Sequence, residues 1–467
     1  CGQCSVIRSC ANRIDYSMTQ SDGPHDGPEK FGDRGQIPEL TCLVVHPVLP
    51  SDFEQRHHGR LPNVQLDEAV GLAAAIHLKV LNAHIAKVYK VTAGYLIGEG
   101  AREIIKQQVE DLSPQVVIVN AALSPVQQRN LEREWNVKVI DRTGLILEIF
   151  GARAQTREGK MQVELASLSF QRSRLVKSWT HLERQRGGTG STGGPGETQL
   201  EIDRRIIDDK IVLLKTQLEQ VRKNRDLQRK SRERVPFPVV ALVGYTNAGK
   251  STLFNTLTGA EVFAENLLFA TLDPTMRRMK LPGGRDIILS DTVGFISDLP
   301  THLVAAFRAT LEQVQYADVI LHVRDISSPD TEAQRQDVMS ILKDLEIDYD
   351  TDPRIVEVLN KIDQIPPEDE PVFRHPELRG RHIAVSALTG QGLSDLKTII
   401  EQTLGQSQTR HRITLSAEDG KALAWLHRHG SVLSRDDDPS SGAIHLDVSL
   451  DDGEYQKFIA QFGDGKI

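Results

Sequence analysis

The sequence predicts an α/β protein with four ordered parts: a small N-terminal α/β domain, an antiparallel helical hairpin, a P-loop domain with a mostly parallel, doubly wound sheet, and a small C-terminal α+β domain. A phosphate-binding loop pattern lies between a strand pattern and a helix pattern near the middle of the 467-residue chain. Upstream of it, two long stretches with apolar residues at helical spacing flank a glycine-rich segment. Elsewhere, short apolar runs alternate with helical patterns, which is typical of α/β domains.

The first part of the chain divides into a polar segment and a small domain. Residues 1–38 are polar and rich in Gly and Asp, which predicts disorder. Residues 39–150 are expected to form the N-terminal α/β domain. Apolar runs predict strands over residues 42–45 and 116–119, and a helical pattern extends over residues 67–83.

Residues 151–235 are predicted to form the hairpin, with a tip at residues 187–196 that contains six glycines in ten positions. Each arm of about 30 residues would be about 45 Å long. The apolar positions that define its seam are Met161, Leu165, Leu168, Leu175, Trp179 and Leu182 in the first arm, and Leu200, Ile207, Ile211, Leu214, Leu218 and Val221 in the second. A flexible linker between two ordinary core helices is the alternative interpretation.

The hairpin is basic although the chain is acidic. Residues 151–235 contain 19 Lys and Arg against 11 Asp and Glu, whereas the whole chain has a net charge of −8. A dense basic run near the end of the second arm consists of Arg222, Lys223, Arg225, Arg229, Lys230, Arg232 and Arg234. This distribution favours a polyanionic partner such as RNA. A solvated helix face with i,i+4 ion pairs is the alternative.

Residues 244–251 (GYTNAGKS) fit the phosphate-binding P-loop pattern. The preceding residues 238–243 predict a buried strand and the following residues 252–257 a helix. Glycines let backbone N–H groups converge on phosphates, and the helix N-terminus adds a favourable dipole. Lys250 is assigned to the β- and γ-phosphates. The predicted contacts of this loop are Gly244, Tyr245, Thr246, Asn247, Ala248, Gly249, Lys250, Ser251 and Thr252.

Further along the chain, residues 291–294 (DTVG) follow an apolar strand pattern. Asp291 at a strand end can hold Mg²⁺ through water, and the N–H of Gly294 can reach a terminal phosphate. Thr271 lies where a switch threonine would close over the metal. The predicted Mg²⁺ site is therefore Ser251, Thr271 and, through water, Asp291, and the phosphate contacts extend over Asp291, Thr292, Val293 and Gly294.

Two later motifs predict recognition of guanine. Asp363, in residues 360–363 (NKID), can accept hydrogen bonds from guanine N1 and N2, a pair that adenine does not offer. Residues 386–388 (SAL) follow another strand pattern and can donate a backbone N–H to guanine O6. The predicted contacts are Asn360, Lys361, Asp363, Ser386, Ala387 and Leu388. Five motifs in this order, each at or near a strand end, predict a site for GTP or GDP with Mg²⁺ in residues 236–405.

The array resembles that of translation-factor-type GTPases, in which hydrolysis depends on positioning and electrostatics. This resemblance assigns catalytic roles to Lys250, Thr271 and Gly294. Phe295 stands where Ras-like enzymes carry a glutamine that orients water, and phenylalanine cannot do so. We therefore expect hydrolysis that is slow in the isolated protein and stimulated by a partner. Hydrophobic packing of the switch is the alternative role for Phe295, and it also leaves the glutamine missing.

Asn247 is a second departure from Ras-like sequences. Some GTPases with Asn at this loop position bind K⁺ beside the phosphates, where the cation replaces an arginine finger. An Asn that only stabilises the loop is the alternative.

Residues 186–188 (RGG), 194–197 (GPGE) and 200–205 (LEIDRR) resemble the signature of the HflX family of GTPases, and residues 269–275 (FATLDPT) and 291–296 (DTVGFI) match it as well. The resemblance covers roughly residues 40–405. It implies a monomeric, GTP-hydrolysing factor that binds the large ribosomal subunit and its ribosomal RNA. It also implies a hairpin tip directed at the peptidyl-transferase centre and a role in splitting or rescuing stalled ribosomes.

A GTP-switched regulatory module for a protein partner and an RNA-remodelling GTPase remain alternatives at this point. Selective charge reversal of the hairpin separates the regulatory module from a ribosome-binding factor, because only the latter needs a basic hairpin. An RNA-modifying enzyme is disfavoured, because the sequence shows no evident catalytic Cys, metal cluster or methyl-donor loop.

Residues 408–467 are expected to form the C-terminal α+β domain, with a helix over residues 418–429, a strand over residues 443–448 and a solvated acidic loop at residues 436–438. The cysteines are Cys1, Cys4, Cys10 and Cys42. Cys1 and Cys4 lack a second pair at zinc-ligand spacing, so a metal site there is disfavoured. The sparing use of cysteine suits a reducing cytosol. The sequence contains no run of about 18 apolar residues, so we expect no membrane span. A cytoplasmic location is therefore expected.

Overall fold

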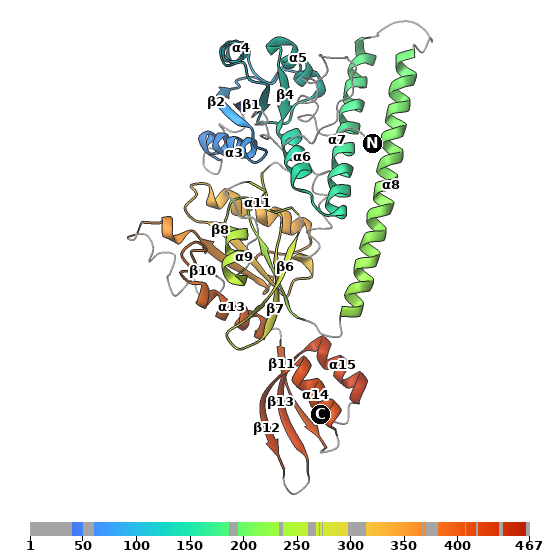
Figure 1. The fold of residues 1–467 in the computed structure, drawn as a ribbon, viewed down its shortest axis with the longest axis vertical. Helices are drawn as coiled ribbons and strands as arrows, with labels where there is room; N and C mark the ends of the chain where they lie inside the picture. Colours follow the sequence, from blue (N-terminus) through green and yellow to red (C-terminus); the bar gives the residue numbers. More distant parts are fainter. Residues whose placement is uncertain are drawn as a thin grey trace, which may run out of the picture.

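The computed structural model of the chain (Figure 1) consists of three sheets and a long pair of helices. In parts of the helix pair and of residues 408–463, the C-terminal unit, only the backbone is described. No helix in the described ranges combines the length and the apolar composition that crossing a bilayer requires. The described residues are 40–49, 60–185, 195–232, 237–259, 268–269, 271–272, 274–297, 314–366, 368, 382–406, 408–416, 419–438 and 442–463.

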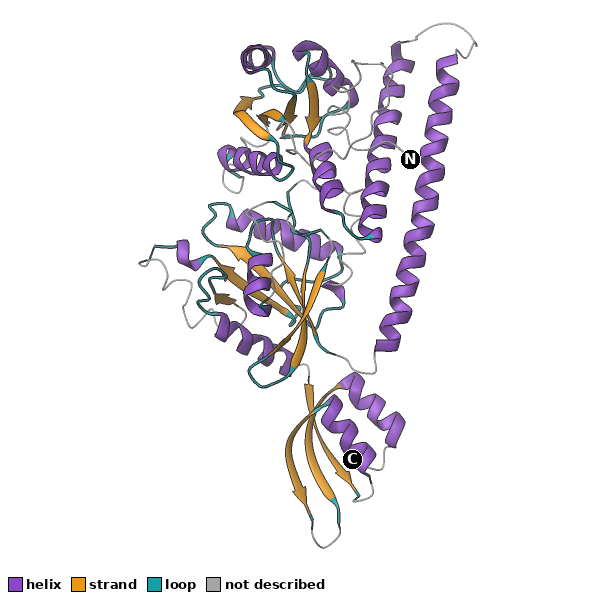
Figure 2. Cartoon of the chain, in the orientation of Figure 1, coloured by secondary structure: helices purple, strands orange, loops and turns teal. Residues whose placement is uncertain are grey.

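Residues 40–153, the N-terminal unit, combine strands with helices (Figure 2). Their four strands form a parallel sheet of order β2-β1-β3-β4. The predicted strands at residues 42–45 and 116–119 are confirmed. The strands are β1 (Thr41–Val48), β2 (Lys79–Lys87), β3 (Val116–Val119) and β4 (Lys138–Asp141), and the helices are α3 (Pro62–Ala74), α4 (Glu99–Leu112), α5 (Pro125–Trp135) and α6 (Arg142–Arg153).

The expectation of one helical stretch over residues 67–83 is wrong beyond Ala74. Helix α3 ends there, His77 takes a positive φ of 59°, and β2 begins at Lys79. Strand β2 pairs with β1 over its whole length. Pairing with a neighbouring strand therefore overrides the helical spacing of the apolar residues.

Two long helices follow, α7 (Arg157–Gln185) and α8 (Pro195–Arg232), and they lie side by side (Figure 1). The predicted hairpin seam forms between them through Met161, Leu165, Leu168, Ile207, Ile211, Leu214, Leu218 and Val221. At 1.5 Å per residue, α8 is about 57 Å long. The predicted tip at residues 187–196 is wrong at its end, because Pro195 and Gly196 begin α8. Residues 187–194 lie outside the described residues, as do the side chains of Trp179, Leu182 and Leu200 and those of the basic run apart from Lys223.

Residues 237–406, the P-loop unit, contain a six-stranded sheet of order β10-β9-β8-β5-β7-β6, in which only β6 runs antiparallel to its neighbour. Helices α9 and α13 pack on one face and α11 on the other. The predicted mostly parallel, doubly wound sheet is therefore confirmed. The strands are β5 (Val239–Val243), β6 (Thr275–Lys280), β7 (Asp286–Asp291), β8 (Val319–Asp325), β9 (Ile355–Asn360) and β10 (His382–Ala384), and the helices are α9 (Lys250–Thr258), α11 (Thr331–Asp344) and α13 (Leu393–Gln406).

The C-terminal unit is an antiparallel sheet of order β11-β13-β12 that packs against two helices. The predicted loop at residues 436–438 is wrong in part, because Asp436 and Asp437 belong to β12 and pair with residues of β13. An ion pair between Arg435 and Asp437 offsets the charge there. The elements are β11 (Gln408–Leu415), α14 (Gly420–His429), β12 (Ser431–Asp437), β13 (Ile444–Asp451) and α15 (Asp452–Phe462).

A buried polar network crosses the β8–β9 side of the P-loop sheet. The Nδ1 of His322 lies 2.6 Å from the hydroxyl of Tyr349, which donates to Glu357. Burial lowers the pKa of His322 to about 3, against the opposing charge of Glu357. Burial alone would raise the pKa of Glu357, but hydrogen bonds from His382, Arg335 and Tyr349 outweigh it and hold that pKa below its usual range. The network therefore requires a neutral histidine beside an ionised glutamate.

This network predicts a loss of stability in mild acid. Between pH 6.5 and about 3, His322 takes up a proton in the unfolded chain but not in the folded protein, so folding weakens as the pH falls. From pH 7 to 5.5 we expect this residue to remove about 1 kcal/mol from the free energy of unfolding. Urea unfolding at both pH values checks this: His322→Gln should lose that much less than the wild type. The exposed His427→Gln serves as control, and an equal pH effect in all three proteins would contradict the assignment.

Candidate nucleotide-binding site

The P-loop follows β5 in a conformation that requires glycine at two positions. Gly244 has φ 150° and Gly249 has φ 91°. A Cβ atom on Gly244 would lie 2.2 Å from the carbonyl oxygen of Val323, and one on Gly249 would lie 2.2 Å from Nδ2 of Asn360. The loop therefore packs directly against the ends of β8 and β9, where no side chain fits.

Lys250 begins α9 and is buried beneath the loop. Its Nζ donates to the carbonyl oxygens of Gly244 at 3.1 Å and of Tyr245 at 2.8 Å. Burial lowers the pKa of Lys250 to about 8, against the opposing charge of Asp291. An anionic group in the loop would restore the charged form of the lysine, since it compensates for the lost hydration. The geometry thus suits a phosphate ligand.

The three residues predicted to bind Mg²⁺ meet at one point. The Ser251 Oγ and the Thr271 Oγ1 each lie 2.7 Å from Oδ2 of Asp291, and 3.0 Å from each other. The other carboxylate oxygen, Oδ1 of Asp291, is buried with no hydrogen-bond partner among the described residues. Burial raises the pKa of Asp291. A hard cation would satisfy that orphaned oxygen, and hydroxyl and carboxylate oxygens are suitable ligands or water-binding groups for Mg²⁺.

Asn360 braces the P-loop against the predicted guanine loop. Its Nδ2 donates to the Ala248 carbonyl at 2.8 Å, and its Oδ1 accepts from the N–H of Ala387 at 3.0 Å. Lys361 takes a positive φ of 68° and its Nζ reaches Asp325 at 2.6 Å. Asp363 is exposed at the start of the adjoining turn (Ile362–Gln364). The structure therefore leaves the Asp363 carboxylate open to a base.

Three of the other predicted contact residues, Thr292, Ser386 and Ala387, make hydrogen bonds inside the protein. The hydroxyl of Thr292 turns inward and donates to the Leu242 carbonyl at 2.6 Å. The N–H of Ser386 donates to the Gln391 carbonyl and the N–H of Ala387 donates to Asn360 Oδ1. Leu388, in contrast, is 77% exposed. The donor to guanine O6 remains a prediction.

The segment after β7 lies directly on the P-loop. The N–H of Phe295 donates to the Gly244 carbonyl at 3.0 Å, and the N–H of Thr246 donates to the Phe295 carbonyl at 2.7 Å. A Cβ on Gly294 would lie 3.0 Å from both the Lys250 Nζ and the Thr246 Cα, so a side chain there would require these neighbours to shift by a few tenths of an ångström. The Phe295 side chain is buried in the core beneath α11. The structure thus favours packing as the role of this side chain, which leaves no glutamine at the position.

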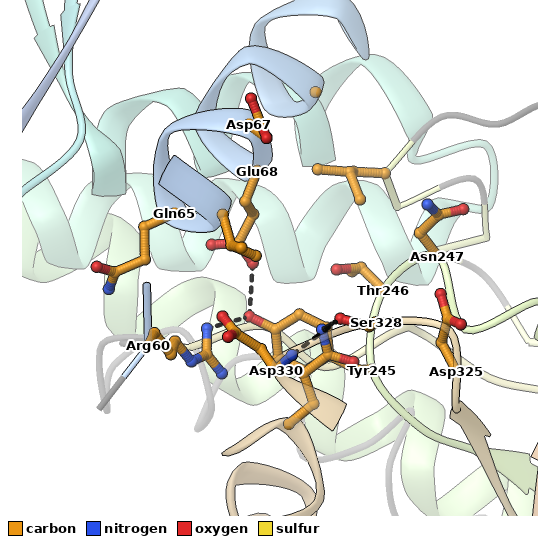
Figure 3. A pocket seen from close by; sticks show the side chains of 14 residues that line it. Arg60, Gln65, Asp67, Glu68, Tyr245, Thr246, Asn247, Asp325, Ser328 and Asp330 are labelled. Atoms are coloured by element: carbon orange, nitrogen blue, oxygen red, sulfur yellow. Dashed lines mark hydrogen bonds between the residues drawn. The ribbon is translucent and has the colours of Figure 1, made fainter. Parts of the chain in front are cut away.

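Sequence reasoning missed the contact between the P-loop and the N-terminal unit. The Tyr245 side chain points toward Glu68 on α3 and toward Arg60 (Figure 3). A cavity of about 250 Å³ lies beside this contact, with Asn247 on its wall. Asn247 is exposed and has φ 61°, a conformation that Asn tolerates better than most residues. A bulky tyrosine inside a phosphate-binding loop was the one available signal for a docking partner.

Comparison with known proteins assigns most of the chain to one family. Four matches cover residues 63–151 (GTP-binding GTPase N-terminal), 153–232 (GTP-binding GTPase middle region), 239–361 (50S ribosome-binding GTPase) and 372–467 (HflX C-terminal domain). The GTPase HflX of Magnetococcus marinus is 51% identical over 400 residues, which are 85% of this chain and 90% of that protein. The chain belongs to the HflX family of GTPases.

Two further relatives accompany this assignment. The GTPase HflX of Escherichia coli is 44% identical over 349 residues, 72% of this chain and 81% of that protein. A crystal structure of a GTP-binding protein from Sulfolobus solfataricus in complex with GDP covers 79% of this HflX-family chain and 99% of its own, with 25% identity and a TM-score of 0.43. At that TM-score, the assignment rests on the sequence matches. This HflX-family protein is accordingly a GTPase with a ribosome-binding type of GTPase domain.

The exposed carboxylate of this HflX-family GTPase predicts its base specificity. Asp363→Asn should weaken GTP binding by at least about 100-fold, because an amide oxygen cannot accept both hydrogen bonds while its NH₂ faces the donors of guanine. Xanthosine triphosphate should bind the variant better than the wild type, since xanthine offers an acceptor at C2. Titration with fluorescent nucleotides measures both affinities. Asp395→Asn, an exposed change on α13, is the control, and an unaltered GTP affinity in Asp363→Asn would refute the assignment.

Proposed function

We propose that this GTPase binds the large ribosomal subunit and its ribosomal RNA, and that it splits or rescues stalled ribosomes. The observation that carries the proposal is a P-loop unit of the ribosome-binding type joined to a long basic pair of helices. The helix α8 is long enough, at about 57 Å, to carry its glycine-rich end well beyond a binding surface. We further propose that the protein acts as a cytoplasmic monomer, where its ribosomal partner works.

The exposed surface of α8 has basic side chains that could contact a polyanionic partner, and some of them are paired with acidic residues. Its apolar seam faces α7, and Arg204 and Arg205 are exposed on the remaining surface. Some basic side chains of α8 are paired, because Arg204 lies 3.8 Å and Lys223 4.0 Å from acidic residues one turn away. Such exposed pairs contribute little and rearrange readily when phosphates approach. The excess of basic residues over residues 151–235 therefore supports RNA contact.

For hydrolysis, we propose that Lys250 and the N–H of Gly294 stabilise charge on the phosphates. Ser251 and Thr271 would hold Mg²⁺ directly and Asp291 would hold it through water. The bound cation supplies charge neutralisation at the phosphate oxygens. The convergence of these three side chains and the orphaned Asp291 oxygen support these roles. Because Phe295 cannot orient water, hydrolysis is proposed to be slow until the ribosome supplies or orders the missing group.

Large ribosomal subunits should therefore stimulate GTP turnover. We expect a rise of roughly tenfold or more when purified subunits are added, which corresponds to about 1.4 kcal/mol off the barrier. Phosphate release with and without subunits, together with co-sedimentation, measures the effect. Absence of both stimulation and co-sedimentation would instead favour a GTP-switched regulatory module for a protein partner.

Charge reversal on the hairpin should abolish the ribosome contact while GTP binding persists. Replacing Arg222, Lys223 and Arg225 with Glu should lower ribosome affinity steeply at low salt, and it should flatten the dependence of that affinity on salt, because fewer phosphate contacts release fewer counterions. The matched control reverses three exposed lysines of the other units, Lys90, Lys343 and Lys421. Equal co-sedimentation of both triple variants would show that the basic run has no special part in binding.

The K⁺ hypothesis for Asn247 has its own test. We propose that K⁺ binds beside the phosphates, supported by the exposed side chain of Asn247 at the cavity wall. Turnover should then be several-fold higher in KCl than in NaCl at equal ionic strength, and Asn247→Ala should remove the difference. Equal turnover in the two salts would leave Asn247 as a residue chosen for its positive φ.

A further inference from the structure

The N-terminal unit contacts both segments that would sense the γ-phosphate. We propose that this contact sets the preference of the protein for GTP over GDP, with Tyr245, Arg142 and Phe150 as positioning residues. The inference rests on the roles proposed above for Thr271 and Gly294. It concerns a different question, namely which contacts between the P-loop unit and the N-terminal unit hold those two groups in place.

The first half of the contact holds the segment that follows Gly294. The Tyr245 hydroxyl accepts from the Ser297 N–H at 2.9 Å and from the Arg60 Nη1 at 2.7 Å, and it donates to Glu68 Oε1 at 2.5 Å. Both acceptor positions and the single donor of the hydroxyl are therefore used. Ser297 is only three residues beyond Gly294, so one oxygen atom joins the P-loop, this segment and α3.

Arg142, the first residue of α6, reinforces the same segment. From the N-terminal unit, its Nη2 donates to the Ser297 carbonyl at 3.2 Å and to the Ser297 Oγ at 3.0 Å. The same nitrogen lies 3.0 Å from Glu68 Oε2, and Nη1 donates to Asn120 at 2.6 Å. Arg142 is buried, and a buried guanidinium is costly unless such partners surround it. The position of Ser297 is thus part of what satisfies this charge.

The second half of the contact holds the segment that precedes Thr271. The Phe269 ring meets the Phe150 ring of α6 edge to face, with centroids 4.7 Å apart and planes at 78°. Leu268 and Leu272 belong to the same apolar cluster as α3 and α6. Phe269 has φ 56°, a left-handed backbone conformation. This conformation is unfavourable for a bulky residue unless packing compensates for its cost in free energy. Two residues later, Thr271 reaches Asp291.

These contacts favour the arrangement in which Thr271 lies with Ser251 and Asp291, as the triphosphate state requires. GDP has no γ-phosphate and gains nothing from Thr271 or Gly294 in these positions. A contact that stabilises only the closed arrangement strengthens GTP binding relative to GDP binding, and by reciprocity GTP strengthens the contact. The N-terminal unit therefore acts as a built-in clamp on the two segments.

The test is the ratio of two dissociation constants, for GDP and for a non-hydrolysable GTP analogue, both measured with Mg²⁺ on the full chain. We expect Tyr245→Phe, which removes one oxygen atom and leaves the buried Ser297 N–H without its acceptor, to lower the Kd(GDP)/Kd(analogue) ratio about fivefold, or about 1 kcal/mol. Phe150→Leu, which acts on the other segment, should lower the ratio as well. The matched control is Tyr349→Phe, whose hydroxyl bonds to Glu357 and contacts neither segment, and it should keep the wild-type ratio.

Two results would overturn the proposal: an unchanged ratio in both variants, which includes an equal loss of affinity for both nucleotides, or a rise in the ratio. Thr271→Ala separates this inference from the site assignment on which it rests. That variant should also lower the ratio, because Thr271 is proposed to act only in the triphosphate state. If Thr271→Ala leaves the ratio unchanged, the proposed metal role of Thr271 fails. If it lowers the ratio and the two clamp variants do not, the inference alone fails.

Discussion

The site depends on how closely the P-loop backbone approaches the ends of the strands beside it. Gly244 and Gly249 leave no room for a Cβ, and Asn360 fills the gap with an amide that bonds to Ala248 and Ala387. This one side chain links the phosphate-binding loop to both guanine motifs. The carboxyl ends of parallel strands meet at one edge of the sheet, and there Asn360 joins the loop after β5 to the segment after β10.

A second set of buried polar contacts extends the site beyond the P-loop unit. Tyr245 and Ser297 belong to the P-loop unit, whereas Glu68, Arg142 and Arg60 lie upstream of the hairpin. Buried polar groups must find partners in the fold, so the docked position of the N-terminal unit and the position of the segment after Gly294 are linked. Domain docking and the position of that segment can therefore influence one another through a few hydrogen bonds.

Much of the fold followed from local patterns. The P-loop with its strand and helix, the hairpin seam and the strands at residues 42–45 and 116–119 were predictable, because each has a strong periodicity or a fixed glycine spacing. The helical stretch over residues 67–83 and the acidic loop at residues 436–438 were not. In both cases a strand forms because a neighbouring strand offers a ladder of hydrogen bonds: β2 pairs with β1, which lies before α3, and β12 pairs with β13, the next strand along the chain.

The sequence by itself determined that this protein is a GTPase, and it predicted motifs for phosphate, Mg²⁺ and guanine in a fixed order and a missing glutamine at Phe295. Those properties reside in residue identity and short spacing. Only the tertiary structure decided that Phe295 packs inward, that Asp291 keeps an unsatisfied oxygen, and that Tyr245 bonds to a glutamate 177 positions away. The first two depend on packing inside the P-loop unit and the third on how that unit packs against the N-terminal unit, and no local pattern records which buried groups will meet.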